Sequence, residues 1–173
     1  MRKILVVIDM QKDFVDGALG TKEAVAIVPS VVEKIKSYEP ANVFATRDTH
    51  QENYMETQEG KNLPVPHCIE GTEGWEIDKD VAKVLEGAVI INKPTFGSTV
   101  LADEMMQIAQ NEEIEIELIG LCTDICVVSN SLILKACMPE VKISVDSKCC
   151  AGVTPEKHEA ALETMRSCQI NVM

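Results

Sequence analysis

Short apolar runs of strand length, separated by segments with helical periodicity, constrain the fold of this chain most strongly. The first run, Lys3–Ile8 (KILVVI), is almost continuously apolar, a pattern typical of a strand buried on both faces of a parallel sheet. Later apolar runs are also predicted strands, the last one a short edge strand: Asn42–Thr46, Gly87–Ile91, Ile114–Gly120, Val141–Val145 and Ile170–Val172. We therefore expect an α/β fold with three Rossmann-like layers, in which helices flank a mostly parallel sheet of five or six strands.

The intervening segments include the predicted helices. These are Pro29–Tyr38, Asp78–Leu85, Gly97–Gln110, Cys126–Cys137 and a last helix from Pro155 to about Arg166. The last helix has a strong start signal, because Thr154 is a good N-cap and Pro155 a good first helical residue. Two segments, Asp9–Gly20 and Arg47–Trp75, are expected to be loops. A loop as long as the second is usually functional or disordered.

Composition excludes several classes of protein. The chain has 173 residues, of which 46% are hydrophobic, so one domain spanning residues 1–173 is expected. Its formal net charge of -12 argues against binding to nucleic acid or to an anionic membrane surface. No apolar run approaches the roughly 20 residues of a membrane helix, and the run before Asp9 is too short for a signal peptide. The seven cysteines are odd in number, which favours reduced thiols in the cytoplasm over a disulfide framework.

A candidate nucleophile lies in the stretch Glu117–Ser131 (ELIGLCTDICVVSNS), where a predicted strand passes through a sharp turn into a predicted helix. Cys126 stands at the start of that helix, where unpaired backbone N–H groups carry partial positive charge. This position is expected to lower the pKa of the thiol and to favour the reactive thiolate. The alternative is an inert cysteine of the core.

Two charged residues follow other predicted strands and could meet Cys126. Asp9 follows the first strand and Lys93 the third, so both are expected at the carboxyl edge of the sheet, where ligands gather in α/β folds. Asp9 could accept the thiol proton, while the charge of Lys93 would favour both the aspartate and the thiolate. This trio predicts hydrolysis through a thioester, with the stored proton passing to a leaving amine. The alternatives are a turn or cap role for Asp9 and a solvated surface position for Lys93.

The long loop expected after the second strand contains a candidate metal site. Asp48 and His50 can point the same way from an extended segment, and His67 could join them from the far end of the loop. Two histidines and a carboxylate can bind zinc, iron or manganese. A further oxygen ligand could come from a glutamate of the same loop: Glu59 first, Glu52 or Glu56 less favourably. The alternative is a polar surface loop with two ordinary histidines.

Several motifs, taken in order, resemble those of the isochorismatase-like cysteine hydrolases, and within them the nicotinamidase type. They are VVIDMQKDF at Val6–Phe14, DTH at Asp48–His50, PHCIEGT at Pro66–Thr72, the strand end at Lys93, GLCTDICV at Gly120–Val127, and the tail from Asp146 through Thr154 and His158 to Met165. No single motif is decisive, but all of them in this order are quite specific. The resemblance covers nearly the whole chain.

The resemblance implies a role for the trio and for the turn before Cys126. The family's Asp-Lys-Cys catalytic triad falls on Asp9, Lys93 and Cys126. A non-proline cis peptide bond is implied at Leu121–Cys122. The backbone N–H groups of Cys122 and Cys126 would form the oxyanion hole.

The resemblance also implies a metal cofactor and a substrate class. The metal ligands of the nicotinamidase type fall on Asp48, His50 and His67, with Glu59 as the candidate fourth ligand. The divalent metal, zinc or alternatively iron or manganese, engages the pyridine nitrogen of the substrate in that type. Relatives that act on isochorismate, ureidoacrylate or carbamoylsarcosine generally lack this metal set. We therefore expect hydrolysis of nicotinamide to nicotinate and ammonia, by a protein of a family that often forms homo-oligomers.

The chain departs from the family pattern in two places. Nicotinamidases often carry an aromatic residue shortly before the position of His67, and this chain has Leu63–Val65 (LPV) there. Phe14 and Phe96 could still wall the substrate pocket, or both could belong to the core. Cys122 stands where a small residue such as alanine is common. Two other hypotheses therefore stay open: a hydrolase of another small amide or ureide, and a small-molecule-binding relative without turnover.

Overall fold

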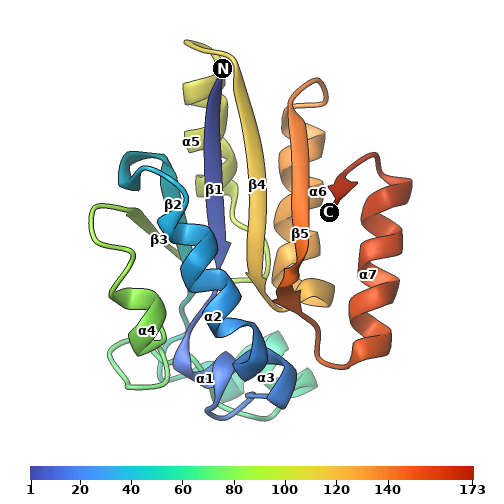
Figure 1. Cartoon of the computed structure of the whole chain (residues 1–173). Coiled ribbons are helices and arrows are strands. Elements are labelled where there is room, and N and C mark those ends of the chain that lie inside the picture. Colours follow the sequence, from blue (N-terminus) through green and yellow to red (C-terminus); the bar gives the residue numbers. More distant parts are fainter.

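A six-stranded sheet forms the centre of the computed structural model, which describes all residues from Met1 to Met173 (Figure 1). The strand order is β3-β2-β1-β4-β5-β6, and every neighbouring pair is parallel. The strands are β1 (Arg2–Ile8), β2 (Val43–Asp48), β3 (Val89–Lys93), β4 (Ile114–Leu121), β5 (Lys142–Ala151) and β6 (Asn171–Val172). The predicted α/β class and mostly parallel sheet are confirmed.

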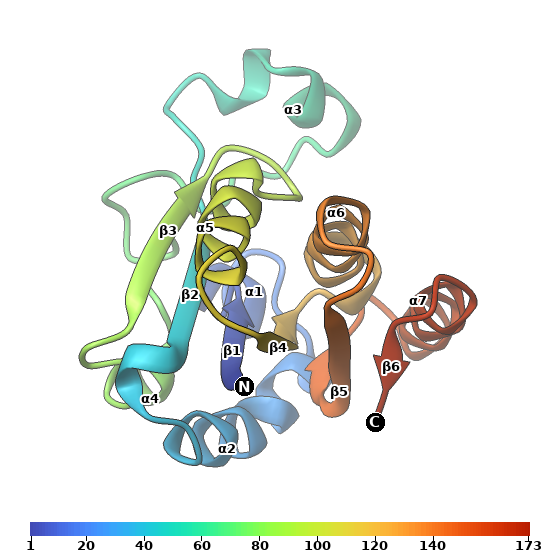
Figure 2. The same cartoon turned by 90° about the horizontal axis from the view of Figure 1, so that it is seen from above.

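Helices cover both faces of the sheet and give the molecule three layers (Figure 2). One face packs against α5 (Thr99–Ala109), α6 (Val128–Cys137) and α7 (Pro155–Ser167). The other packs against α1 (Lys12–Val15), α2 (Lys22–Lys36) and α4 (Lys79–Ala82). Successive residues of β1 alternate between the two cores, with Ile4 in the first and Leu5 in the second. No helix combines the length and apolarity that crossing a bilayer requires.

The predicted helix Pro29–Tyr38 is the second part of a longer helix. The Thr21 hydroxyl accepts a hydrogen bond from the Ala24 N–H, so α2 begins at Lys22 and Pro29 lies inside it. The expected loop Asp9–Gly20 likewise contains the single turn of α1.

Three strands extend further than their sequence predictions, and this changes where site residues lie. Asp48 is the last residue of β2 and Lys93 the last of β3, so the two pair within the sheet instead of following it. Strand β5 continues to Ala151 through an irregularity in its pairing with β4. Consequently Cys149 and Cys150 are buried strand residues that pack into opposite cores.

The first part of the segment between β2 and β3, residues 49–75, lies over the carboxyl ends of the central strands, at the bottom of Figure 1. It contains two short helical pieces, η2 (Tyr54–Glu56) and α3 (Gln58–Asn62), where the sequence predicted only a loop. The Thr57 hydroxyl accepts a hydrogen bond from the Gly60 N–H and caps α3. A parallel bridge between His50 and Ile69 ties the two ends of this segment together.

Candidate active site

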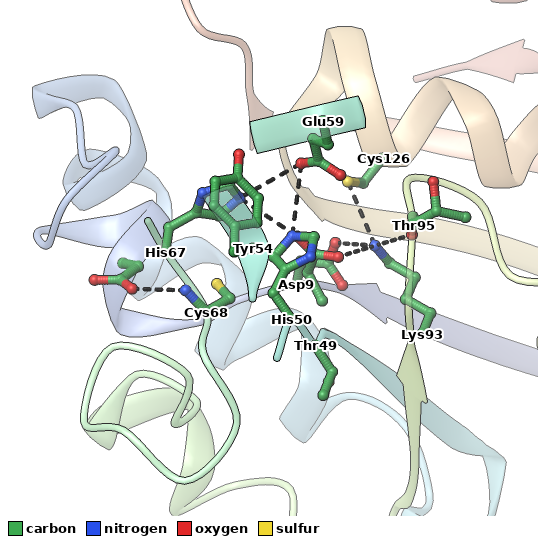
Figure 3. Close-up of polar contacts among 12 residues, drawn as sticks. Asp9, Thr49, His50, Tyr54, Glu59, His67, Cys68, Lys93, Thr95 and Cys126 are labelled. Atoms are coloured by element: carbon green, nitrogen blue, oxygen red, sulfur yellow. Dashed lines mark hydrogen bonds and ion pairs between the residues drawn. The ribbon is translucent and has the colours of Figure 1, made fainter. Parts of the chain in front are cut away.

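Asp9, Lys93 and Cys126 meet at the carboxyl edge of the sheet, and all three are buried (Figure 3). Lys93 is central, because its Nζ lies 2.6 Å from Asp9 Oδ2 and 3.5 Å from Cys126 Sγ. The same ammonium donates a hydrogen bond of 2.9 Å to the Thr95 carbonyl. The structure therefore brings together the trio that the sequence predicted. Asp9 follows β1, Lys93 ends β3, and Cys126 lies in the turn after β4.

The backbone beside Asp9 explains how its carboxylate turns toward Lys93. Asp9 follows β1 with a φ of 46°, in the left-handed region that aspartate tolerates better than most residues. The Thr46 hydroxyl donates a hydrogen bond of 2.6 Å to Asp9 Oδ1. On the neighbouring strand, a Cβ at Gly120 would lie 2.1 Å from the Ile8 carbonyl oxygen, so only glycine lets β4 pass this close to the end of β1.

Burial controls the charges of the trio. It raises the pKa of the Asp9 carboxyl, an effect that the charge of Lys93 opposes. Burial is the largest single influence on the Lys93 ammonium and lowers its pKa, but the negative groups around it, Asp9 first among them, together outweigh burial and raise the pKa of Lys93. The site therefore holds a charged lysine next to a carboxylate whose affinity for a proton is increased.

The expected lowering of the Cys126 pKa is wrong in this structure. Cys126 lies inside a π-helical turn, η3 (Thr123–Val127), that continues into α6, so it is not the first helical residue. Burial raises the pKa of its thiol well above the usual range, and the negative charge of Asp9 raises it further. The thiol is thus protonated at rest, and a base is needed to generate the thiolate.

The turn before Cys126 is held from two sides. The Leu121–Cys122 peptide bond is cis, as the resemblance implied. The Cys122 carbonyl accepts hydrogen bonds from the Ile125 and Val127 N–H groups, each at 3.1 Å. Thr123 Oγ1 lies 2.7 Å from His158 Nδ1 on α7, a contact that the sequence analysis did not predict. Burial raises the pKa of the Cys122 thiol to about 12.

The four candidate metal ligands also converge. One ligand atom from each of Asp48, His50, Glu59 and His67 lies within 4.8 Å of all the others. Asp48 Oδ2 is 2.9 Å from His50 Nε2 and 3.6 Å from His67 Nε2, while Glu59 Oε1 lies 3.5 and 3.7 Å from the same two nitrogens. Glu52 and Glu56, the weaker candidates, are outside the group.

The surroundings aim the histidines toward a common point. His67 Nδ1 lies 2.8 Å from the Val65 carbonyl, which fixes a ring orientation with Nε2 directed at Asp48. The ring of Tyr54 packs edge-on against both histidine rings, at 4.8 and 5.1 Å between centroids. Asp13 Oδ2 accepts a hydrogen bond of 2.8 Å from the Cys68 N–H, next to His67.

A divalent metal fits this donor set. Two imidazole nitrogens and two carboxylates suit zinc, iron or manganese, and the spacing allows one ion to contact all four groups. Asp48 Oδ1 is buried without a hydrogen-bond partner, 3.6 Å from Lys93 Nζ. Asp48 thus faces both the candidate metal site and the trio.

The two candidate pocket residues have different environments. The Phe14 ring is nearly buried, and its centroid lies 5.4 Å from that of His67. Phe96, in the loop after β3, is 42% exposed. The structure therefore places Phe14 beside the candidate metal ligands and Phe96 at the surface.

Sequence reasoning missed two fully buried amides that connect the site loops, Gln11 and Asn130. Gln11 Nε2 donates to the Asp48 and Trp75 carbonyls at 2.8 and 2.9 Å, and Gln11 Oε1 accepts from the Asp48 N–H at 2.7 Å. The only sequence signal for Gln11 was its place in the motif that contains Asp9. Its partners Asp48 and Trp75 are distant in sequence, so no local pattern predicts these hydrogen bonds.

Comparisons with known proteins agree with this architecture. A family model described as "Isochorismatase domain" matches residues 3–173. An uncharacterized isochorismatase family protein, PncA of Bacillus subtilis, is 26% identical, with 94% of this chain and 93% of that protein covered. The crystal structure of nicotinamidase/pyrazinamidase PncA from Bacillus subtilis superposes with a TM-score of 0.86 at 26% identity, covering 99% of each chain. The pyrazinamidase of Pyrococcus horikoshii in complex with zinc gives 0.79 at 29% identity, covering 100% of this chain and 99% of that one.

Proposed function

The chain belongs to the isochorismatase family of hydrolases, and we propose that it is a metal-containing cysteine amidohydrolase that converts nicotinamide and water to nicotinate and ammonia. One observation carries the proposal: a metal-type donor set and a Cys-Lys-Asp trio share the carboxylate of Asp48, which faces both. A substrate with a metal-binding ring nitrogen and an amide on the same ring would suit such a pair of sites. The similarity to a nicotinamidase and to a zinc-bound pyrazinamidase supports the same substrate class.

In the proposed first half-reaction, Asp9 removes the proton from Cys126 as the thiolate attacks the amide carbon. The raised pKa of Asp9 makes it a competent base, and Lys93, within 3.5 Å of the sulfur, stabilises the negative charge that develops there. The oxygen of the tetrahedral intermediate would be stabilised by the backbone N–H groups of Cys122 and Cys126.

The first half-reaction ends when the stored proton leaves with ammonia. Asp9 passes it to the amide nitrogen, the C–N bond breaks, and ammonia departs from the Cys126 thioester. In the second half-reaction Asp9 takes a proton from water as the water attacks the thioester carbonyl. It returns this proton to the Cys126 sulfur when the C–S bond breaks, which releases nicotinic acid, ionised to nicotinate at neutral pH, and the free thiol. A divalent metal held by Asp48, His50, Glu59 and His67, which we propose to be zinc, would supply a Lewis acid for the pyridine nitrogen. A cytoplasmic location and a homo-oligomeric state stay predictions from the sequence.

Ammonia release by purified protein, measured together with its metal content, tests the proposal. We expect release from nicotinamide with about one metal ion per chain, and much slower release from benzamide, which has the same amide but no ring nitrogen. Equal rates for the two substrates would contradict the role of the ring nitrogen. Bound metal without hydrolysis of either would contradict nicotinamide as the substrate.

A second candidate is hydrolysis of another small amide or ureide, and the sequence LPV at Leu63–Val65 favours it, because no aromatic ring is available there. The Leu63 carbonyl instead accepts a hydrogen bond from the Tyr54 hydroxyl. A panel of heteroaromatic amides and ureides, assayed by ammonia release, separates the two candidates. The same trio would serve both reactions.

A further inference from the structure

The loop that follows β3 determines where the Lys93 ammonium points. Lys93 Nζ donates to the Thr95 carbonyl, so the loop is part of the lysine's own hydrogen-bond shell (Figure 3). The loop ends at Ser98, whose hydroxyl accepts from the Leu101 N–H and caps α5. Any shift of this loop relative to α6 would therefore change the distance between Lys93 and Cys126.

A single buried amide joins this loop to the helix that carries Cys126. Asn130 Nδ2 donates to the Phe96 carbonyl at 3.1 Å and to the Cys126 carbonyl at 2.8 Å. Asn130 Oδ1 accepts from the Ser98 N–H at 2.9 Å. The side chain is fully buried, so water does not compete for these bonds.

The bonding pattern requires an amide in particular. Only a primary amide offers two N–H donors and an acceptor on one short side chain. A hydroxyl has only one O–H donor, so it cannot donate to both the Phe96 and the Cys126 carbonyls. Next to Asn130, the Ser131 hydroxyl donates to the Val127 carbonyl at 2.8 Å, which is the same i−4 contact that Asn130 makes to Cys126.

We propose that Asn130 is a positioning residue, which fixes the loop 93–98 against the Cys126 turn and so holds Lys93 at its working distance from the sulfur. It acts through backbone groups and touches neither the thiol nor the substrate. The inference rests on the proposed nucleophilic role of Cys126. It concerns kcat more than substrate binding, because the candidate metal ligands lie on other segments.

The variant Asn130→Ser tests this role, since serine can keep the i−4 bond to Cys126 and loses both bonds to the loop. We expect kcat for nicotinamide to fall by about 10- to 100-fold, as for small misplacements of catalytic groups, with KM changed less than about threefold. We also expect the pH midpoint for alkylation of Cys126 by iodoacetamide, followed by mass spectrometry at that residue, to rise as Lys93 moves away.

A matched control is Asn111→Ser. Asn111 is exposed and makes the same type of i−4 bond, from Nδ2 to the Gln107 carbonyl, with no bond to the site. It should leave kcat and the alkylation profile unchanged. An Asn130→Ser protein with the wild-type alkylation profile would overturn the inference, even if its kcat were lower, because the amide would then be merely structural.

Two further readouts test the inference if the variant does not fold or if the wild-type protein does not hydrolyse nicotinamide. If Asn130→Ser fails to fold, hydrogen exchange of the wild-type Ser98 amide decides: the bond to Asn130 requires slow exchange, and fast exchange would overturn the inference. Alkylation of Cys126 can also be measured in a protein that does not hydrolyse nicotinamide. A wild-type protein that leaves nicotinamide intact would contradict the proposed function alone, while the alkylation comparison would still decide the role of Asn130.

Discussion

The proposed triad and the proposed metal site lie side by side but are held in different ways. Asp9, Lys93 and Cys126 come from the end of β1, the end of β3 and the turn after β4, all anchored in the sheet. Of the proposed metal ligands, only Asp48 belongs to a strand, whereas His50, Glu59 and His67 lie in the segment between β2 and β3. The triad should therefore keep its geometry without metal, while the proposed ligands outside the sheet should become more mobile when the ion is removed.

Asp48 is where the two parts meet. Its two carboxylate oxygens face opposite ways, one toward the histidines and the other toward Lys93. The Gln11 side chain fixes the backbone of Asp48, because it donates to the Asp48 carbonyl and accepts from the Asp48 N–H. Substitutions in the proposed triad should therefore lower turnover without changing metal affinity, and substitutions of the histidines should lower metal affinity first. Substitution of Asp48 itself should affect both turnover and metal affinity.

The largest effect is expected for Cys126→Ala. Turnover should fall by about 10⁴-fold or more, the scale seen when the nucleophile of a triad is removed. Metal content should stay close to wild type, because the proposed metal ligands are untouched, while loss of the buried sulfur should cost about 1 kcal/mol of stability and leave the fold intact. Cys137→Ala, at an exposed cysteine of α6, is the control. Loss of metal from Cys126→Ala would contradict the separation of the two parts.

The next largest effect is expected for Asp48→Asn. Affinity for zinc should fall by at least about 10- to 100-fold, and turnover should stay low even at saturating zinc, because the charge beside Lys93 is lost. His50→Ala is the comparison: it should also lose affinity for metal, but saturating zinc should restore more of its activity. Titration with zinc, followed by activity and metal analysis, distinguishes the two. Full recovery of Asp48→Asn would show that this carboxylate serves only the metal.

The same contrast explains what could be predicted from the sequence. The apolar run before Asp9 and the strand before Lys93 identify strands, and parallel strands bring their carboxyl ends to one edge, so the trio was predictable. The candidate ligands Asp48, His50 and His67 were predicted from residue type and from family resemblance, and the structure brings them together. The helical piece that carries Glu59 was not predicted, because α3 depends on the Thr57 cap and on contacts with Tyr54.

Burial and distant hydrogen bonds account for the errors. The sequence placed Cys126 at a helix start, but the π-helical turn begins at Thr123 and the thiol is enclosed, so desolvation raises its pKa. Asn130 was unnoticed because its partners Phe96 and Ser98 are more than 30 residues away. Local patterns carry no information about such bonds.

A smaller and more local effect is expected when the metal is removed by a chelator. Hydrogen exchange should become faster in Tyr54–Asn62, since Glu59 would lose the proposed ion between α3 and the histidines, while β1 and β4 should be unaffected. A metal at 100 times its dissociation constant stabilises the folded state by about 2.7 kcal/mol, so the melting temperature should also fall. Hydrogen-exchange mass spectrometry with and without chelator measures this. Equal acceleration in β1 would show that both parts of the site depend on the metal.

The smallest effect is expected for Cys122→Ala. The proposed contribution of Cys122 is its backbone N–H, which alanine also has, and its thiol, with a pKa of about 12, is protonated at neutral pH. Turnover should therefore stay within about threefold of wild type, and partial loss of side-chain packing should cost less than about 1 kcal/mol of stability. Steady-state rates and thermal melts of this variant beside Cys126→Ala check both statements. A severe loss of turnover here, with activity retained in Cys126→Ala, would reverse the assignment of the nucleophile. It would also mean that the sulfur beside Lys93 is the structural one.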